Sequence, residues 1–112
     1  MTVQIDQRGD GVVVVAFDEP RIDAANSPSL RKDLVGLLEA GASQLVLDLR
    51  DVKFIDSSGL GMLVTILKRA GMRGGVALCR LQAPVAATFR LARMDKVFPL
   101  FADVPAALDS LR

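Results

Sequence analysis

The residues best able to do chemistry lie close together in residues 51–64, DVKFIDSSGLGMLV. Two neighbouring hydroxyls, Ser57 and Ser58, follow an acid, Asp56, and precede Gly59. A serine before a helix most simply caps it by accepting a hydrogen bond from a free backbone N–H, which stabilises the helix by about 1 kcal/mol. One cap needs one hydroxyl, so the second hydroxyl requires another explanation.

The glycines of this stretch favour a surface role. Gly59 and Gly61 fall in the first turn of the expected helix, where each lowers helix propensity by roughly 1 kcal/mol relative to alanine. A helix start that served structure alone would not favour them. Glycine leaves the backbone exposed and lets another protein approach closely. The turn is therefore either a simple cap made by Ser57 or Ser58, or a surface for a partner.

The chain lacks the groups that would make such a serine catalytic. It contains no histidine, which excludes a Ser-His-Asp triad and removes the commonest metal ligand. No G-x-x-x-x-G-K-[ST] phosphate loop is present, and no cysteines and acids have the spacing of a metal site. We therefore expect a protein that is not an enzyme, with no catalytic residue, no metal and no cofactor.

Composition excludes several other classes. The chain has 112 residues, enough for one domain, and its 14 basic and 13 acidic residues give a net charge of +1. This balance argues against a nucleic-acid partner and against a polybasic membrane surface. No secretory signal or membrane-spanning stretch is visible. A single cysteine, Cys79, excludes an internal disulfide and fits a reducing cytoplasm, so we expect a cytoplasmic domain.

Strands and helices alternate along the chain. An alternating strand near residues 3–6 and an apolar strand at residues 12–17 flank a Gly-Asp-Gly turn and predict a hairpin. Further strands are expected at residues 45–49, 74–81 and 97–101, the last an edge strand because it contains Pro99. Helices are expected to begin near Pro28, Ser57, Pro84 and Pro105, with Ser27 as the N-cap of the first.

The resulting order, β-β-α-β-α-β-α-β-α, predicts an α/β domain with mainly parallel or mixed strand pairing. Ligands and partners of such sheets tend to meet the carboxyl ends of the strands, and Ser57 lies at such an end. Two polar side chains lie in apolar strands. Asp48 is expected to face solvent or to bond a neighbouring backbone group, because an unpaired buried acid is costly. Cys79 is expected to be a small buried hydrophobe.

Residues 45–49, LVLDL, a spacer and then residues 54–61, FIDSSGLG, resemble the STAS domain of anti-sigma factor antagonists, also called anti-anti-sigma factors. The resemblance extends over essentially all 112 residues, from the early hairpin to the final alanine-rich helix. It implies a single STAS domain, residues 1–112, with a central mixed β-sheet of about five strands and about four helices.

The resemblance also implies a phosphorylation switch. In the family, the first serine of the pair is phosphorylated by a partner anti-sigma factor that is itself a serine kinase, and that position is Ser57 here. The unphosphorylated form binds the anti-sigma factor and frees the sigma factor. The phosphorylated form lets go, and a serine phosphatase restores it. The implied partner-binding residues are Asp23, Asp56, Ser57, Ser58, Gly59, Leu60 and Gly61.

One part of the chain departs from the family pattern. The family often has a Gly-x-Leu-Asp turn after the second strand, where this chain has Pro20-Arg21-Ile22-Asp23. Asp23 is matched, either as a partner contact or as a loop acid or helix cap. Arg21 could pair with it or could simply be solvated. The altered turn bears on the identity of the partner more than on the fold.

Three alternatives remain open from the sequence. The domain could serve another phospho-switch or a larger stress-signalling assembly. It could bind a nucleotide, although the missing phosphate loop argues against turnover. It could also be a structural domain whose serines only cap a helix. The chain is expected to be a monomer or a weak dimer.

Overall fold

The computed structural model describes residues 3–71 and 75–111 of the chain. Among these, seven strands, four α-helices and one short 3₁₀ helix follow in the order β1 (Val3–Gln7), β2 (Val12–Phe17), β3 (Arg21–Ile22), α1 (Ser27–Glu39), β4 (Gln44–Asp48), β5 (Phe54–Ile55), α2 (Ser57–Ala70), β6 (Val76–Cys79), α3 (Ala83–Leu91), η1 (Met94–Lys96), β7 (Leu100–Phe101) and α4 (Val104–Ser110).

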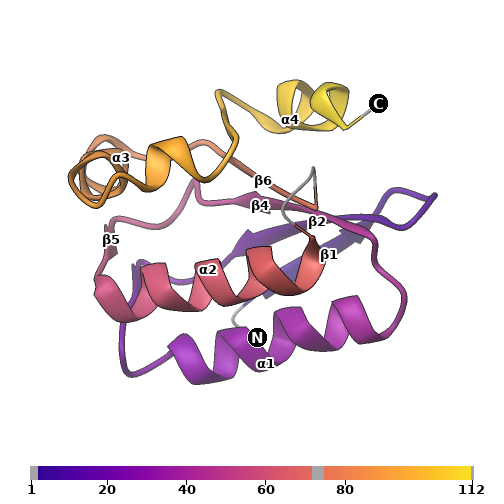
Figure 1. The fold of residues 1–112 in the computed structure, drawn as a ribbon, viewed down its shortest axis with the longest axis horizontal. Coiled ribbons are helices and arrows are strands. Elements are labelled where there is room, and N and C mark those ends of the chain that lie inside the picture. The colour runs from indigo at the N-terminus through magenta and orange to yellow at the C-terminus, as the bar shows by residue number, and fades with distance from the viewer. Residues whose placement is uncertain (1–2, 72–74, 112) are drawn as a thin grey trace.

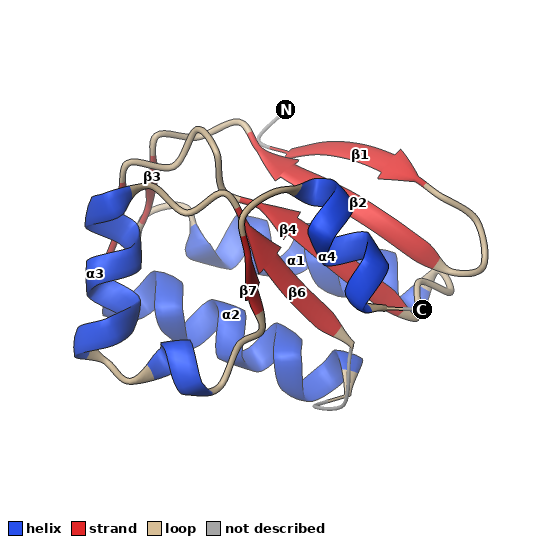
Figure 2. Cartoon of the chain, turned by 90° about the horizontal axis from the view of Figure 1, so that it is seen from above, coloured by secondary structure: helices blue, strands red, loops and turns tan. Residues whose placement is uncertain are grey.

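Five of the strands form one mixed sheet, in the order β1-β2-β4-β6-β7 (Figure 2). β1 pairs antiparallel with β2, and the other neighbours pair parallel. The predicted hairpin, the mixed sheet of five strands and the four helices are therefore confirmed. The predicted strand at residues 74–81 starts on residues outside the described part, and β6 is shorter than predicted. The edge strand is also shorter, because Val97 and Pro99 lie outside β7.

Helices cover both faces of this sheet. Figure 1 shows α1 and α2 side by side on one face and α4 on the other. Because successive strand residues point to opposite faces, Leu45 and Leu47 of β4 join the larger core under α1 and α2, while Val46 joins the smaller core under α4. All three are fully buried. Cys79 is buried in the smaller core, as expected.

A second, two-stranded parallel sheet was not expected from the sequence. Arg21 of β3 is paired with Phe54 of β5, and Ile22 is paired with Ile55. The pairing ties the segment that precedes α1 to the segment that precedes α2. It therefore fixes the positions of the two helix starts relative to each other.

None of the helices within residues 3–71 and 75–111 combines the length and the apolar character needed to cross a membrane.

Candidate functional site

The serine pair forms the first two residues of α2, directly after β5 (Figure 1). Both serines are exposed. Throughout the part of the chain that the structure describes, neither hydroxyl is engaged in a hydrogen bond. Two free hydroxyls therefore lie at the surface, at the end of a short strand and the start of a helix.

The N-cap of α2 is Asp56, so the alternative in which Ser57 or Ser58 caps the helix is wrong. The Asp56 backbone is extended, with φ −107° and ψ −174°, and its Oδ1 accepts a hydrogen bond from the Gly59 N–H at 3.0 Å. Its carbonyl oxygen accepts from the Leu60 N–H, also at 3.0 Å. Asp56 thus caps α2 in place of the serines, and the hydroxyls of Ser57 and Ser58 are not needed for capping.

The two glycines of the motif have different reasons to be glycine. A Cβ on Gly59 would lie 2.7 Å from Ile55 Cγ1 and 2.8 Å from the Ile22 carbonyl oxygen, closer than side chains approach. Gly59 is buried, so it serves the close packing of α2 against the β3–β5 pair rather than close approach by a partner. Gly61 is exposed, and a Cβ there would meet nothing within 4 Å. An exposed backbone was expected at both glycines, and only Gly61 has it.

Leu60, one of the expected contact residues, is mostly buried. Its side chain is 8% exposed and belongs to the larger core. Leu60 therefore anchors the first turn of α2 from below. Of the motif residues after Asp56, those on the surface are Ser57, Ser58 and Gly61.

The structure brings Asp23 next to the serine turn. The Asp56 N–H donates to the Ile22 carbonyl at 3.2 Å, which extends the β3–β5 pairing by one step and places the following residue, Asp23, beside the turn. Of the two alternatives for Arg21, the structure shows the ion pair, with Arg21 Nε 3.3 Å from Asp23 Oδ2. The Arg21 guanidinium also lies over the Phe54 ring, 4.2 Å from its centroid.

Asp23 is held as a carboxylate. Loss of solvent around the group opposes ionisation, but this is outweighed by hydrogen bonds from the Ala25 N–H, the Arg21 side chain and the Asn26 N–H, so the pKa of Asp23 lies below its ordinary value. The acid organises the loop before α1 and keeps a partly exposed negative charge beside the serines.

A family model described as the STAS domain matches residues 4–107 of the chain. The chain belongs to the STAS domain family. This confirms the resemblance found in the motif FIDSSGLG, and the sheet of five strands with four helices agrees with the fold of solved STAS-type proteins.

Known STAS proteins resemble the chain over most of its length. The anti-sigma-B factor antagonist of Bacillus subtilis (strain 168) is 44% identical over 75 residues, which are 67% of this chain and 66% of that protein. The crystal structure of an anti-sigma factor antagonist from Mycobacterium paratuberculosis superposes with a TM-score of 0.87 and 28% identity, covering 99% of this chain and 93% of that chain.

Two structures of SpoIIAA also share the fold. The anti-sigma factor antagonist SpoIIAA in its unphosphorylated form has a TM-score of 0.81 at 19% identity, covering 98% of this chain and 96% of its own. The Bacillus cell fate determinant SpoIIAA in the phosphorylated form has a TM-score of 0.72 at 16% identity, with coverages of 98% and 99%. At this identity the likeness concerns the fold alone.

The start of α1 in this STAS domain differs from the prediction by one residue. Asn26, not Ser27, occupies the N-cap position. The Asn26 side chain does not cap the helix, because its Nδ2 donates to the Arg21 carbonyl at 2.6 Å and its Oδ1 accepts from the Asp23 N–H at 2.9 Å. Ser27 becomes the first helical residue. It is buried, and its hydroxyl has no hydrogen-bond partner within the described residues.

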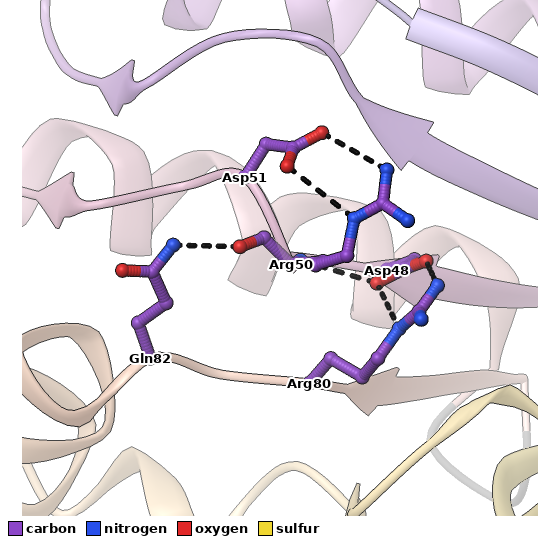
Figure 3. Close-up of polar contacts among 5 residues, drawn as sticks. All are labelled: Asp48, Arg50, Asp51, Arg80 and Gln82. Carbon is purple, nitrogen blue, oxygen red and sulfur yellow. Dashed lines mark hydrogen bonds and ion pairs between the residues drawn. The ribbon is translucent and has the colours of Figure 1, made fainter.

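A second polar cluster lies at the carboxyl ends of β4 and β6. The sequence analysis singled out Asp48 but not its partner, Arg80. Asp48 is 4% exposed and forms a two-pronged ion pair with Arg80, with Arg80 Nε 3.1 Å from Asp48 Oδ1 and Nη2 bonded to Oδ2 (Figure 3). The expected bond to a neighbouring backbone group is also present, from the Arg50 N–H at 3.1 Å, but the alternative that Asp48 faces solvent is wrong. The hydrogen bond from Arg80 to Asp48 raises the pKa of Arg80 above its ordinary value.

The same cluster surrounds the single cysteine. Burial, with a smaller contribution from the Asp48 charge, raises the pKa of Cys79 to about 11. The thiol is therefore protonated near neutral pH and is a poor nucleophile. Among the described residues no group of three or more cysteine and acidic side chains is placed to hold a metal ion.

Proposed function

We propose that the protein is an anti-sigma factor antagonist that binds its cognate anti-sigma factor, a serine kinase, while Ser57 is unphosphorylated. Binding frees the sigma factor. Phosphorylation of Ser57 by that kinase switches the protein off, and a serine phosphatase restores it. The chain itself has no catalytic role in this cycle, takes no cofactor, and acts in the cytoplasm as a monomer or weak dimer without binding nucleic acid or membrane.

The observation that supports this proposal is that Asp56, and not a serine, caps α2. Asp56 caps α2 by accepting the Gly59 N–H, and the exposed Ser57 and Ser58 hydroxyls make no hydrogen bond within the described residues. A kinase requires an accessible hydroxyl as its acceptor, and these two hydroxyls are exposed and free. The names of the relatives, anti-sigma factor antagonists, supply the partner class.

The partner surface follows from the same geometry. It consists of the exposed residues Ser57, Ser58 and Gly61, with the partly exposed acids Asp23 and Asp56 beside them. Gly59 and Leu60 shape this surface from beneath. Residues of both β3–α1 and β5–α2 contribute, so a partner would meet two segments that the β3–β5 pairing holds together.

Phosphorylation at Ser57 should act at the surface and leave the fold intact. A phosphate adds about −1.5 to −2 charge near pH 7. The N-terminus of α2 favours that charge, while the neighbouring Asp56 opposes it, so we expect little refolding. A docked partner would have to strip water from the phosphate. Each 1.4 kcal/mol of that cost lowers affinity about tenfold.

The direct test is to incubate the protein with ATP and the anti-sigma factor candidate encoded in its own genome, and to map phosphate by mass spectrometry. We expect one phosphate, on Ser57. The Ser58→Ala variant is the matched control for the position of the phosphate, because it removes the neighbouring hydroxyl and the phosphate should still map to Ser57, although weaker partner binding should slow the transfer. If Ser57→Ala accepts phosphate as well as the parent does, Ser57 is not the switch.

Binding should change in parallel. Ser57→Ala should bind the anti-sigma factor as the parent does, whereas Ser57→Glu should bind at least about tenfold more weakly because it carries a charge into the interface. Isothermal titration calorimetry measures both. Stable binding with no phosphate on any residue would place the domain outside a kinase cycle, and absence of binding would remove the proposed partner class.

A further inference from the structure

A hollow lies between the first turns of α1 and α2, beside the serine pair. Its volume is about 290 Å³, and its walls include Ser27 and Arg31 of α1 together with Ser58, Gly61 and Thr65 of α2. Ser58 lines this hollow, whereas Ser57 does not. The two serines of the motif therefore face different surroundings.

The hollow exists because small residues meet where the two helices begin. Gly61 has no side chain, and the space that its Cβ would occupy is open to 4 Å. Ala24 and Pro28 form part of the opposite wall, and the buried Met62 also lines the hollow. The opening is thus mainly a feature of the α1–α2 packing, with Ala24 of the preceding loop at its edge.

The polar groups around the hollow favour an anion. Arg31 is exposed and takes part in no ion pair within the described ranges, 3–71 and 75–111. Both helices begin here and run side by side in the same direction (Figure 1), so the positive ends of two helix dipoles are close to the hollow. Asp56 compensates the start of α2, but no acid lies in the first turn of α1.

A buried hydroxyl gives independent evidence for an occupant. Ser27 is 6% exposed, lines the hollow, and its Oγ has no hydrogen-bond partner in the described part of the chain. A buried hydroxyl without a partner is uncommon, because it loses its bonds to water and gains none in return. Thr65, by contrast, is satisfied: its Oγ1 donates to the Gly61 carbonyl at 3.1 Å. An acceptor atom bound in the hollow would supply what Ser27 lacks.

We propose that this hollow seats an acidic side chain of the anti-sigma factor, with Arg31 as its counter-charge and the Ser27 and Ser58 hydroxyls as hydrogen-bond donors. The inference rests on the proposed function and names the chemistry that the partner presents. A guanidinium binds a carboxylate through paired hydrogen bonds, which suits one Asp or Glu side chain. Seating that acid next to Ser57 also sharpens the switch, because phosphate on Ser57 would then face a partner carboxylate as well as Asp56.

The test compares Arg31→Glu with Lys32→Glu. Both reverse one exposed charge on α1, but Lys32 does not line the hollow. Calorimetry with the anti-sigma factor should show a loss of affinity of at least about tenfold for Arg31→Glu and less than about threefold for Lys32→Glu. Circular dichroism should show both variants folded, because both positions are exposed.

Charge reversal on the partner identifies the acid. Each exposed Asp or Glu of the anti-sigma factor is changed to Lys, and one of these variants should restore binding to Arg31→Glu while it weakens binding to the parent and to Lys32→Glu, which both keep Arg31. Ser27→Ala gives a second readout: affinity should fall several-fold while stability is unchanged or raised, since the variant removes an unsatisfied buried hydroxyl. If Ser27 had only a structural role, its substitution would not lower the affinity for the partner while leaving the stability unchanged or raised.

The inference fails if Arg31→Glu and Lys32→Glu bind equally while the parent still binds and is phosphorylated; the proposed function would then stand alone. It also fails if Arg31→Ala alters only the phosphorylated form, because the hollow would then hold the phosphoryl group and not a partner acid. If the parent binds no anti-sigma factor, the proposed function falls first and this inference with it.

Discussion

Two polar sites at the carboxyl ends of strands are built in opposite ways. At the end of β4, the Asp48 carboxylate is buried, paired with Arg80 and bonded to the Arg50 N–H, so its hydrogen-bonding capacity is consumed inside the fold (Figure 3). At the end of β5, the backbone is equally well fixed, by Asp56 and by β3, but the hydroxyls of Ser57 and Ser58 are left free at the surface.

The difference lies in how many polar groups remain unpaired at each site. The first cluster extends outward through Arg50, which pairs with Asp51 at 3.3 Å and whose carbonyl accepts from Gln82 Nε2 at 2.6 Å, so it links two neighbouring segments of the chain. Its charged side chains, Asp48 with Arg80 and Arg50 with Asp51, are paired with one another. In the serine turn, Asp56 caps α2, whereas the hydroxyls of Ser57 and Ser58 form no hydrogen bond within the described residues. A polar residue at the end of a strand is therefore a candidate for a binding site. Candidates with unpaired hydrogen-bonding groups are the stronger ones.

Removing Arg80 should give a large loss of stability. Arg80→Ala leaves the buried Asp48 without its ion-pair partner, which should cost about 2 kcal/mol of unfolding free energy, a value reduced from that of a fully buried pair because the Arg80 side chain is 36% exposed. Urea unfolding measures the change. Arg50→Ala is the control, since its pair with Asp51 is exposed and worth under about 0.5 kcal/mol.

If Arg80→Ala were as stable as Arg50→Ala, the contrast between a structural and a functional site would be lost. Ser57→Ala completes the comparison. It should leave the unfolding free energy within about 0.5 kcal/mol of the parent and abolish phosphorylation.

The two motif glycines allow a matched test inside the serine turn. Gly59→Ala forces a Cβ against Ile55 and the Ile22 carbonyl and should destabilise the fold by about 1–3 kcal/mol. Gly61→Ala has open space and should stabilise α2 by about 0.5–1 kcal/mol through helix propensity. Thermal and urea unfolding of both variants measure the sign. Equal destabilisation by both would mean that the first turn tolerates no side chain, against the geometry.

The cap gives a smaller effect. Asp56→Ala removes the acceptor of the Gly59 N–H and should cost about 1 kcal/mol. Ser58→Ala removes a hydroxyl without a structural bond and should change stability by less than about 0.5 kcal/mol. A larger loss for Ser58→Ala than for Asp56→Ala would restore the capping role that the sequence suggested for the serines.

Much of the fold could be predicted from the sequence, for identifiable reasons. Leucines spaced at helical intervals after Ser27 and Ser57 marked α1 and α2, and apolar runs marked β2, β4 and β6. β3 and β5 were missed because two residues are too short to show a period. η1 was missed for the same reason.

The site was predictable in its position but not in its details. Asp56, Ser57 and Ser58 are all residue types that cap helices, and only the start of α2 decides which one does so. Arg80 lies 32 positions from Asp48, so their pairing needed the register of β4 with β6. The orphan hydroxyl of Ser27 depended on the helix starting one residue earlier than predicted. The residues near each of these positions in the sequence do not predict which residue caps α2, which residue pairs with Asp48 or whether the Ser27 hydroxyl is bonded.

The smallest predicted effect concerns Asp23, which stands between the two kinds of site: it organises its own loop, yet it is partly exposed beside the serines. Because its folded pKa lies below the ordinary value of 3.8, its ionised form stabilises the fold above about pH 4, and that contribution is lost as the pH falls through the folded pKa. Asp23→Asn should therefore be slightly less stable than the parent at pH 7, and the gap should close in acid. Urea unfolding at pH 7 and pH 3 tests this. A gap that stays constant with pH would show that Asp23 acts through its shape in the loop, and its charge would then remain available to a partner.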